Sequence, residues 1–290
     1  MRLDDESESS NVEDRRGGGG IGRAGGLGIG TVVVALIASY FLGIDPRTLL
    51  GVAETVQNVR QAGPTAGQPI DPANDPDAAL KSEMGKILHK TESTWSEIFQ
   101  EGGGQYKKPI LVLYRGQTPT ACGAGQAAMG PFYCPGDQKV YLDMAFFRDM
   151  ETRFKAGGDF ARAYVIAHEI GHHVQNLTGI TEKADALRGR MSEKDYNKVS
   201  VRVELQADCF AGVWAQHANR VKPFLDPQDV DEALRAANAI GDDMLQKQGR
   251  GVVVPDSFTH GSSAQRVRWF KTGFETGSMK SCDTFAAREL

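Results

Sequence analysis

The segment AYVIAHEIGHHVQNLTG, residues 163–179, carries the residues with the clearest capacity for chemistry. It contains the pattern H-E-x-x-H as His168, Glu169 and His172. On a helix, positions i and i+4 lie on one face, so both imidazoles can ligate one Zn²⁺ ion while the adjacent glutamate reaches a metal-bound water. The pattern predicts metal-assisted hydrolysis with one zinc ion per chain and Glu169 as the catalytic base. His173, about 100° further round the helix, should point away from the metal. The alternative is a helix whose histidines only cap it or form hydrogen bonds.

A catalytic zinc needs a third protein ligand. The spacing H-E-x-x-H-x-x-G-x-x-H does not supply it, because Gln175 and Thr178 stand where the glycine and the third histidine should be. The segment SVRVELQADCFAGVWA, residues 200–215, offers Glu204 and Asp208, again four positions apart on a predicted helix. Carboxylates among apolar residues must be paired or bound to metal. We expect Glu204 to be the third ligand and Asp208 to accept a hydrogen bond from a ligand histidine. A solvated helix face is the alternative.

A third polar cluster lies in PDSFTHGSSAQRVRWF, residues 255–270, which contains His260, Arg266 and Arg268. Peptide hydrolysis develops negative charge on the scissile carbonyl oxygen, and a cationic or N–H donor opposite the zinc stabilises that charge. His260 is the candidate for this catalytic role, and an arginine nearby is the other candidate. The alternative is a surface loop in which a serine caps a helix and Arg266 forms a structural ion pair.

These residues need a sheet and helices to position them. Short runs rich in β-branched and aromatic residues predict two strands of one small sheet, at 109–116 and 139–143. The strand around Val140–Asp143 is a candidate to pair with an extended peptide as an added edge strand. Apolar residues at helical spacing predict helices at residues 77–101, 159–178, 194–220 and 228–247. The fold class is therefore α+β, a small sheet followed by a helical half.

The N-terminal part of the chain differs in composition from the rest. Residues 1–26 combine charged side chains with a glycine run and little apolar surface, which predicts a disordered tail. The stretch Ala24–Ile44 has no charge, and about 20 apolar residues span a bilayer, so residues 27–44 are predicted to form a transmembrane helix. More arginines precede the span than follow it closely, which predicts a cytoplasmic N-terminus. Residues 45–76, rich in Pro, Gly and polar residues, indicate a linker.

The compartment follows from this orientation. The predicted protein crosses the cell membrane once, and its domain of residues 77–290 lies in the periplasm or outside the cell. A soluble core helix and a cleaved signal peptide are the alternatives for the apolar stretch. All four cysteines lie in that domain, and an even number suits two disulfides. Cys122–Cys134 would close a loop between the strands and Cys209–Cys282 would pin the C-terminus to a helix, although the sequence permits all three pairings. A reduced, buried set in a cytosolic protein is the alternative.

The composition excludes several classes of protein. The chain has 40% hydrophobic and 24% charged residues and a mean hydropathy of -0.36, which is typical of a soluble globular domain and not of a multi-pass or wholly disordered chain. Its 33 basic and 37 acidic residues give a net charge of -4, without the basic excess of a nucleic-acid-binding protein. The expected partners are a peptide or protein substrate and the membrane, with no nucleic acid. The oligomeric state is left open.

Four segments, HEIGHHVQNLTG, VELQADCFAGVWA, FTHGSSAQRVRWF and CDTF, resemble those of a known bacterial family. This family is the putative neutral zinc metallopeptidases, single-pass membrane-anchored proteins of the zincin type. The resemblance covers residues 77–290 and the N-terminal anchor. It implies a zincin-like fold of the glutamate-ligand type, similar in plan to thermolysin, with His168, His172 and Glu204 on zinc and Glu169 as the base. It implies no particular substrate.

The predicted function is that of a membrane-anchored, zinc-dependent metallopeptidase that hydrolyses peptide bonds. Two other functions fit the same residues. One is a zinc-binding scaffold of the cell envelope without peptidase activity, although a structural zinc site is more often closed by four protein ligands. The other is an amidase that applies the same chemistry to cell-wall peptides.

Overall fold

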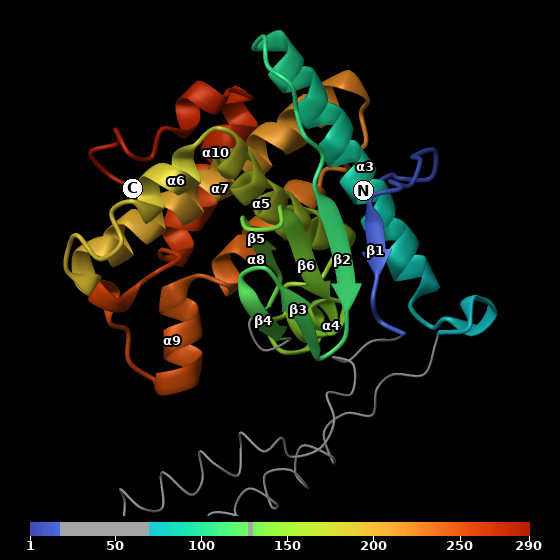
Figure 1. The fold of residues 1–290 in the computed structure, drawn as a ribbon, viewed down its shortest axis with the longest axis horizontal. Coiled ribbons are helices and arrows are strands. Elements are labelled where there is room, and N and C mark those ends of the chain that lie inside the picture. The colour runs from blue at the N-terminus through green and yellow to red at the C-terminus, as the bar shows by residue number, and fades with distance from the viewer. Residues whose placement is uncertain (18–69, 127–129) are drawn as a thin grey trace, which may run out of the picture. The chain divides into compact units, whose positions relative to one another are not determined.

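The computed structural model describes residues 1–17, 70–126 and 130–290. The chain divides into two compact units, of which the first contains Met1–Asp14 together with Pro72–Leu290 and the second contains Arg15–Asp71. In the first unit a small sheet lies beside a larger group of helices, so the α+β class is confirmed (Figure 1).

The strands of the described chain are β1 Val12–Asp14, β2 Ile110–Tyr114, β3 Gln117–Thr120, β4 Gly123–Gln126, β5 Phe132–Cys134 and β6 Lys139–Asp143. Four of them form the main sheet, in the order β1-β2-β6-β5. Strand β2 is parallel to both β1 and β6, whereas β5 runs antiparallel to β6. Strands β3 and β4 form a separate hairpin. The two predicted strands are confirmed as β2 and β6, and they lie at the buried centre of the sheet.

Strand β1 corrects the prediction that residues 1–26 form a disordered tail. Its three residues pair with β2, so the first part of the supposed tail belongs to the folded domain. Ion pairs and hydrogen bonds hold it there. Glu13 accepts a 2.7 Å bond from Lys139, and the Ser9 hydroxyl donates to the buried carboxylate of Glu92 at 2.9 Å. A rule based on apolar content does not count such contacts, which is why composition was misleading here.

The helices of the described chain are α3 Ala78–Glu101, α4 Ala145–Thr152, α5 Asp159–Leu177, α6 Ile180–Asp185, α7 Glu193–Val221, α8 Asp229–Ala239, α9 Asp242–Arg250 and α10 Ser263–Thr276. Short 3-10 turns include η3 Pro255–Ser257 and η4 Met279–Cys282. Helices α3, α5 and α7 agree with their predicted positions within one residue at each end. The predicted helix 228–247 is instead two helices, α8 and α9. The chain breaks at Gly241, where a methyl group would lie 2.5 Å from the Ser263 nitrogen.

Helix α5 lies against α7 at a glycine. A methyl group at Gly171 would lie 2.9 Å from the carbonyl oxygen of Ala207, closer than real side chains come. Gly212 on α7 and Gly273 on α10 face the neighbouring helix backbone in the same way. Glycine at these positions therefore allows α5, α7 and α10 to pack at short distance, which brings the polar faces of α5 and α7 within reach of each other.

Two disulfides join distant parts of this domain, and they are the pairs favoured by the sequence. Cys122–Cys134 connects the β3–β4 turn to β5, and Cys209–Cys282 connects α7 to η4 near the C-terminus. They link segments that hydrogen bonds of the main sheet do not join.

The predicted transmembrane helix, residues 27–44, and most of the predicted linker, residues 45–76, lie outside the described residues. Within the described ranges, no helix combines the length and the apolar content needed to cross a bilayer.

Candidate metal centre

The three side chains predicted to bind zinc meet at one point. Nε2 of His168 lies 3.1 Å from Oε2 of Glu204, and Nε2 of His172 lies 3.5 Å from Oε1 of the same residue. One ligand atom from each of the three lies within 4.8 Å of the others. The histidines occupy adjacent turns of α5, and Glu204 reaches them from α7. Two imidazole nitrogens and one carboxylate oxygen suit Zn²⁺ and leave a fourth position for water, so the donor set fits the predicted metal.

Glu169 lies next to the ligands with one carboxylate oxygen unsatisfied. The side chain is buried, and its Oε2 atom has no hydrogen-bond partner among the described residues. An unpaired buried oxygen is costly, and active sites are where such a cost is tolerated. Burial raises the pKa of Glu169, although the neighbouring histidines oppose the rise. The carboxylate is therefore suited to hold a water molecule and to exchange a proton with it.

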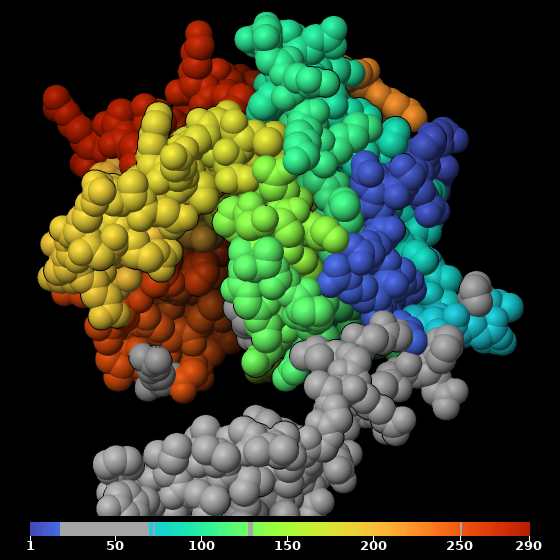
Figure 2. Space-filling view, in the orientation of Figure 1, coloured from blue at the N-terminus to red at the C-terminus, as the bar shows by residue number. Residues whose placement is uncertain are grey.

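A cleft of about 650 Å³ opens over these residues. His168, Glu169, His172 and Glu204 form part of its lining, and aromatic and apolar side chains form much of the rest. In Figure 2 the surface is hollowed between the green segment that carries β5 and the orange segment that carries α9. A cleft of this size can take several residues of a peptide.

Asp208 holds His168 in place, as expected. Its Oδ1 atom lies 2.8 Å from Nδ1 of His168, and it also accepts bonds from the Tyr164 hydroxyl at 2.5 Å and from Nη2 of Arg266 at 2.9 Å. Nε of Arg266 donates to Oδ2 at 2.9 Å. Burial by itself would raise the pKa of Asp208, but the charges of Arg266 and His168 outweigh it and lower the pKa to about 2. The carboxylate is therefore ionised and fixes the proton on Nδ1, which leaves Nε2 of His168 to face Glu204.

Gln175 orients the imidazole of His172, as Asp208 orients that of His168. Its Oε1 atom lies 2.9 Å from Nδ1 of His172, while its Nε2 donates to the carbonyl of Val203 and to Gln206. Because the amide nitrogen is committed to these two acceptors, the oxygen faces the imidazole and orients its Nε2 toward Glu204. The sequence analysis missed this role. The signal was the position of Gln175 three residues after His172, on the same side of the helix.

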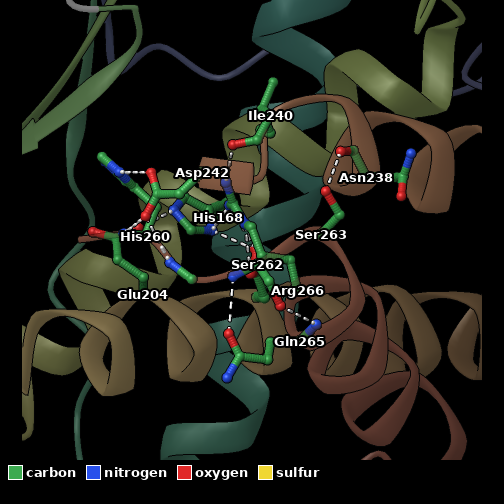
Figure 3. A network of polar contacts seen from close by, with 12 residues as sticks. His168, Glu204, Asn238, Ile240, Asp242, His260, Ser262, Ser263, Gln265 and Arg266 are labelled. Atoms are coloured by element: carbon green, nitrogen blue, oxygen red, sulfur yellow. Dashed lines mark hydrogen bonds and ion pairs between the residues drawn. The ribbon is translucent and has the colours of Figure 1, made fainter. Parts of the chain in front are cut away.

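His260 lies at the cleft and is held by an aspartate that the sequence analysis did not identify (Figure 3). Oδ1 of Asp242 lies 3.2 Å from Nδ1 of His260. The Oδ2 atom accepts the backbone N–H groups of Thr259, His260 and Gly261 at 2.7, 2.7 and 3.1 Å. The hydrogen bond with Asp242 raises the pKa of His260, and the charge of Glu204 adds to the rise. Asp242 is the first residue of α9, and an acidic residue there is too common to indicate this role from sequence.

The arginines of the same segment do not face Glu204 or the Nε2 atoms of the two histidines: Arg266 lies behind His168, with Nη2 3.3 Å from its Nδ1. Arg266 is buried, and its third nitrogen, Nη1, donates to the carbonyl of Ile240 at 3.3 Å. Arg268 is exposed and reaches the C-terminal residue Leu290. The alternative interpretation of this segment is right for Arg266, which forms a structural ion pair, and for Ser262, which caps α10. The geometry therefore favours His260 over an arginine as the group near a reacting carbonyl.

His173 points away from the metal ligands, as expected. Its Nε2 lies 2.6 Å from the carbonyl oxygen of Lys107, and its Nδ1 lies 2.9 Å from the hydroxyl of Tyr133 on β5. Burial lowers the pKa of His173 to about 4, so the ring is neutral at pH 7.

The expectation that Val140–Asp143 pairs with substrate is wrong. This strand, β6, lies between β2 and β5: all five of its residues pair with β2, and Lys139–Tyr141 pair with β5 as well. Strand β5 is the outer strand on this side of the sheet and lines the metal cleft. The sequence hid this arrangement because three residues, Phe132–Cys134, are too short a run to predict as a strand.

Comparison with known proteins agrees with the motifs. The sequence matches the model of the family described as "Putative neutral zinc metallopeptidase" over residues 1–285. The matched range includes β1 as well as every residue of the metal centre.

Two relatives extend over much of the chain. "Uncharacterized protein YpfJ" of Escherichia coli (strain K12) is 48% identical over 98% of this chain and 99% of its own length. "Uncharacterized protein Rv2575" of Mycobacterium tuberculosis (strain H37Rv) is 46% identical over 64% of this chain and 65% of its own length. Neither name assigns an activity. No solved structure matches the chain.

Proposed function

This chain belongs to the putative neutral zinc metallopeptidase family, and from that premise we propose that it is a zinc-dependent peptidase. His168, His172 and Glu204 hold the metal, Glu169 is the base and His260 stabilises the developing oxyanion. The observation that carries the proposal is the meeting of three ligand atoms beside a buried glutamate oxygen that has no partner.

Each residue has a separate task. Zinc, when bound, supplies a Lewis acid that polarises the scissile carbonyl and lowers the pKa of a water molecule. Glu169 accepts the proton of the attacking water on its unpaired oxygen and returns it to the leaving amine. Its raised pKa supports this double role, because the proton must be gained and lost within one turnover.

His260 acts on the carbonyl oxygen. Asp242 holds it and favours its protonated form, which can donate a hydrogen bond to negative charge. Arg266 is committed to Asp208 and is a support for His168.

The substrate is placed as an extended peptide against β5. This strand has a neighbour in the main sheet on one side, β6, and it lines the metal cleft. Main-chain hydrogen bonds to such an outer strand bind a peptide with little dependence on its sequence. The apolar cleft walls, which include Phe132, Phe146 and Phe154, favour apolar substrate side chains.

The test measures zinc content and casein cleavage of the full chain, with Glu169→Gln and Glu204→Gln beside the wild type. The full chain is needed because β1 is part of the sheet. We expect Glu169→Gln to keep its zinc and to lose cleavage by about 10²–10⁴-fold. Glu204→Gln should lose both the zinc and the cleavage. Glu182→Gln, an exposed acid on α6, is the matched control and should change neither.

Each result discriminates between functions. Full activity in Glu169→Gln would contradict the mechanism. Bound zinc without cleavage of any substrate favours the scaffold function. Cleavage of purified wall peptides without cleavage of casein favours an amidase.

A further inference from the structure

We propose that Tyr133 is a positioning residue that sets the substrate strand against the metal ligands, an inference that rests on the proposed function. Tyr133 is the central residue of β5 and lines the cleft. Its hydroxyl joins this outer strand to α5, the helix that carries His168, Glu169 and His172.

Two residues of α5 contact Tyr133, and they lie one and four positions after the ligand residue His172. Its hydroxyl oxygen lies 2.9 Å from Nδ1 of His173 and accepts a 3.0 Å bond from Nδ2 of Asn176. Nε2 of His173 lies 2.6 Å from the carbonyl of Lys107, next to β2. The His173 ring is fully buried and meets the rings of Tyr133 and Tyr106 edge to face, at centroid distances of 5.4 and 5.6 Å.

The directions of these hydrogen bonds are determined. A carbonyl oxygen only accepts, so Nε2 of His173 must carry the ring proton and Nδ1 must accept. The Tyr133 hydroxyl therefore donates to Nδ1, and its oxygen accepts from the amide of Asn176. These three hydrogen bonds form a series from Asn176 through Tyr133 and His173 to the carbonyl of Lys107. Each donor in the series has an acceptor, so the three bonds have a single consistent direction. Phenylalanine at position 133 would keep the ring packing and lose both bonds.

Two adjacent histidines of α5 face different partners. His172 turns toward the metal and His173 turns toward β5, so a single turn of helix contacts both the metal and the strand. The Tyr133 hydroxyl therefore helps to fix the distance from the ligand residues to the outer edge of β5. A peptide bound along β5 inherits that distance, and a displacement of about 1 Å costs on the order of 10²-fold in rate.

The experiment compares Tyr133→Phe with Tyr141→Phe in the full zinc-loaded chain. Tyr141 is on the adjacent strand β6, and its hydroxyl donates to Asp137 in the turn between β5 and β6, so its variant is the matched loss of one tyrosine hydroxyl. Two readouts are used. Hydrogen exchange of the amides of Phe132–Cys134 reports on the strand itself, and kcat/KM is measured for an eight-residue peptide and for a blocked dipeptide that spans only the scissile bond.

We expect Tyr133→Phe to speed exchange in β5 about tenfold, to leave the zinc content unchanged, and to lower kcat/KM about tenfold for the long peptide only. If hydrogen exchange in β5 is unchanged, the Tyr133 hydroxyl does not hold this strand on α5, whatever the activity of the variant. Faster exchange with equal losses on both peptides overturns the positioning role. If the wild-type chain cleaves neither peptide, the proposed function fails. A titration of the long peptide into wild-type and Tyr133→Phe chains then compares their binding affinities. Equal affinities would show that the Tyr133 hydroxyl does not position a bound peptide.

A second and independent inference concerns the membrane. Met1–Asp14 and Pro72–Leu290 form one unit, and β1 lies in register with β2, Val12 opposite Leu111. Lys81 bonds Asp14 at 3.0 Å, and Lys90 bonds Glu6 at 2.8 Å, so the contacts extend beyond the strand.

We infer that the N-terminus and the metal-binding domain lie on the same side of any membrane. Strands that share hydrogen bonds cannot be separated by a bilayer. The connection between them therefore crosses a membrane an even number of times or not at all. The uncharged stretch Ala24–Ile44 has a length of about one crossing. The sequence-based topology, with one span between a cytoplasmic tail and an external domain, does not fit this sheet.

The test labels single added cysteines in intact cells with a maleimide that does not cross membranes. Ser7→Cys probes the N-terminal segment and Val252→Cys probes the domain, because both positions are exposed. The parent chain, whose four cysteines are paired, supplies the background. We expect the two variants to behave alike, both labelled in intact cells or both labelled only after lysis. Labelling of one and protection of the other would overturn the inference.

Discussion

Nδ1 of His168 lies 2.8 Å from Oδ1 of Asp208, and the carboxylate that orients this imidazole is itself held by the buried guanidinium of Arg266. The orientation of a proposed metal ligand on α5 thus depends on an ion pair between α7 and α10. A change in the packing of α7 against α10 should therefore also change the geometry of the candidate metal centre.

Asp208→Asn should weaken both zinc binding and folding. The variant cannot accept bonds from His168 and Arg266 as an anion, and it leaves a buried guanidinium without its counter-charge. We expect zinc affinity to fall by about 10–100-fold and the free energy of unfolding to fall by about 3–5 kcal/mol. Competition with a chelator measures the first and urea unfolding the second. Asp195→Asn, which removes an exposed carboxylate from the first turn of the same helix, should leave zinc affinity unchanged and lower the free energy of unfolding much less than Asp208→Asn does. Equal zinc affinity in wild type and Asp208→Asn would contradict the role of Asp208.

Gly171→Ala should separate α5 from α7. The added methyl group meets the Ala207 carbonyl, so the helices must move apart or strain, at a cost of about 1–3 kcal/mol. Because Glu204 is on α7, zinc affinity should fall together with stability. The matched control is Gly249→Ala on α9, where an added methyl group meets nothing within 4 Å. That variant should be more stable by about 0.5–1 kcal/mol, the usual gain of alanine over glycine in a helix. A stable Gly171→Ala with normal zinc affinity would show that close packing is not required.

Asp242→Asn should shift the pH dependence of cleavage. The hydrogen bond with Asp242 raises the pKa of His260, and a raised pKa keeps the imidazole protonated to higher pH. Activity that needs the protonated ring is therefore lost as pH rises through that pKa. Without the carboxylate the pKa falls toward its ordinary value of 6.5, so the alkaline limb of kcat/KM should move to lower pH, with up to about a tenfold loss for each unit moved.

Glu97→Gln is the control for that experiment. It removes a carboxylate from a similar pair, with His217 at 3.2 Å, away from the cleft. Its pH profile should match the wild type. An unshifted alkaline limb in Asp242→Asn would exclude protonated His260 from the mechanism.

Loss of the Cys209–Cys282 disulfide should destabilise the chain more than loss of Cys122–Cys134. The first closes a loop with a sequence separation of 73 residues and the second one of 12. The loop-closure relation gives about 4 kcal/mol for the longer loop and about 3 kcal/mol for the shorter one. Paired alanine variants of each bridge, unfolded in urea, measure the difference. The reverse order would mean that strain or denatured-state structure outweighs loop length.

Most of the metal centre was accessible from the sequence because its key spacings are local. His168, Glu169 and His172 span little more than one turn of α5, and Glu204 and Asp208 span little more than one turn of α7. A helix face is a property of spacing alone, so the sequence placed His168 with His172 on one face and Glu204 with Asp208 on another, and the structure brings these faces together. The fold class and the main helices were predictable from the same periodicity.

The errors concern contacts between segments far apart in the sequence. Helix periodicity did not reveal that Asp242, after a break at Gly241, holds His260, or that β5 and not β6 is the outer strand. Composition indicated a disordered N-terminal tail, yet Val12–Asp14 complete the sheet.

The sequence by itself determined which residues can bind zinc and which helices carry them, because a helix repeats every 3.6 residues and places neighbours in the sequence on known faces. Only the tertiary structure decided how the centre is supported. Asp208 meets Arg266 across 58 positions, Tyr133 meets His173 across 40, and β1 meets β2 across the whole N-terminal region. Such pairings depend on how closely the helices and strands pack, and packing is a property of the complete fold and not of local spacing.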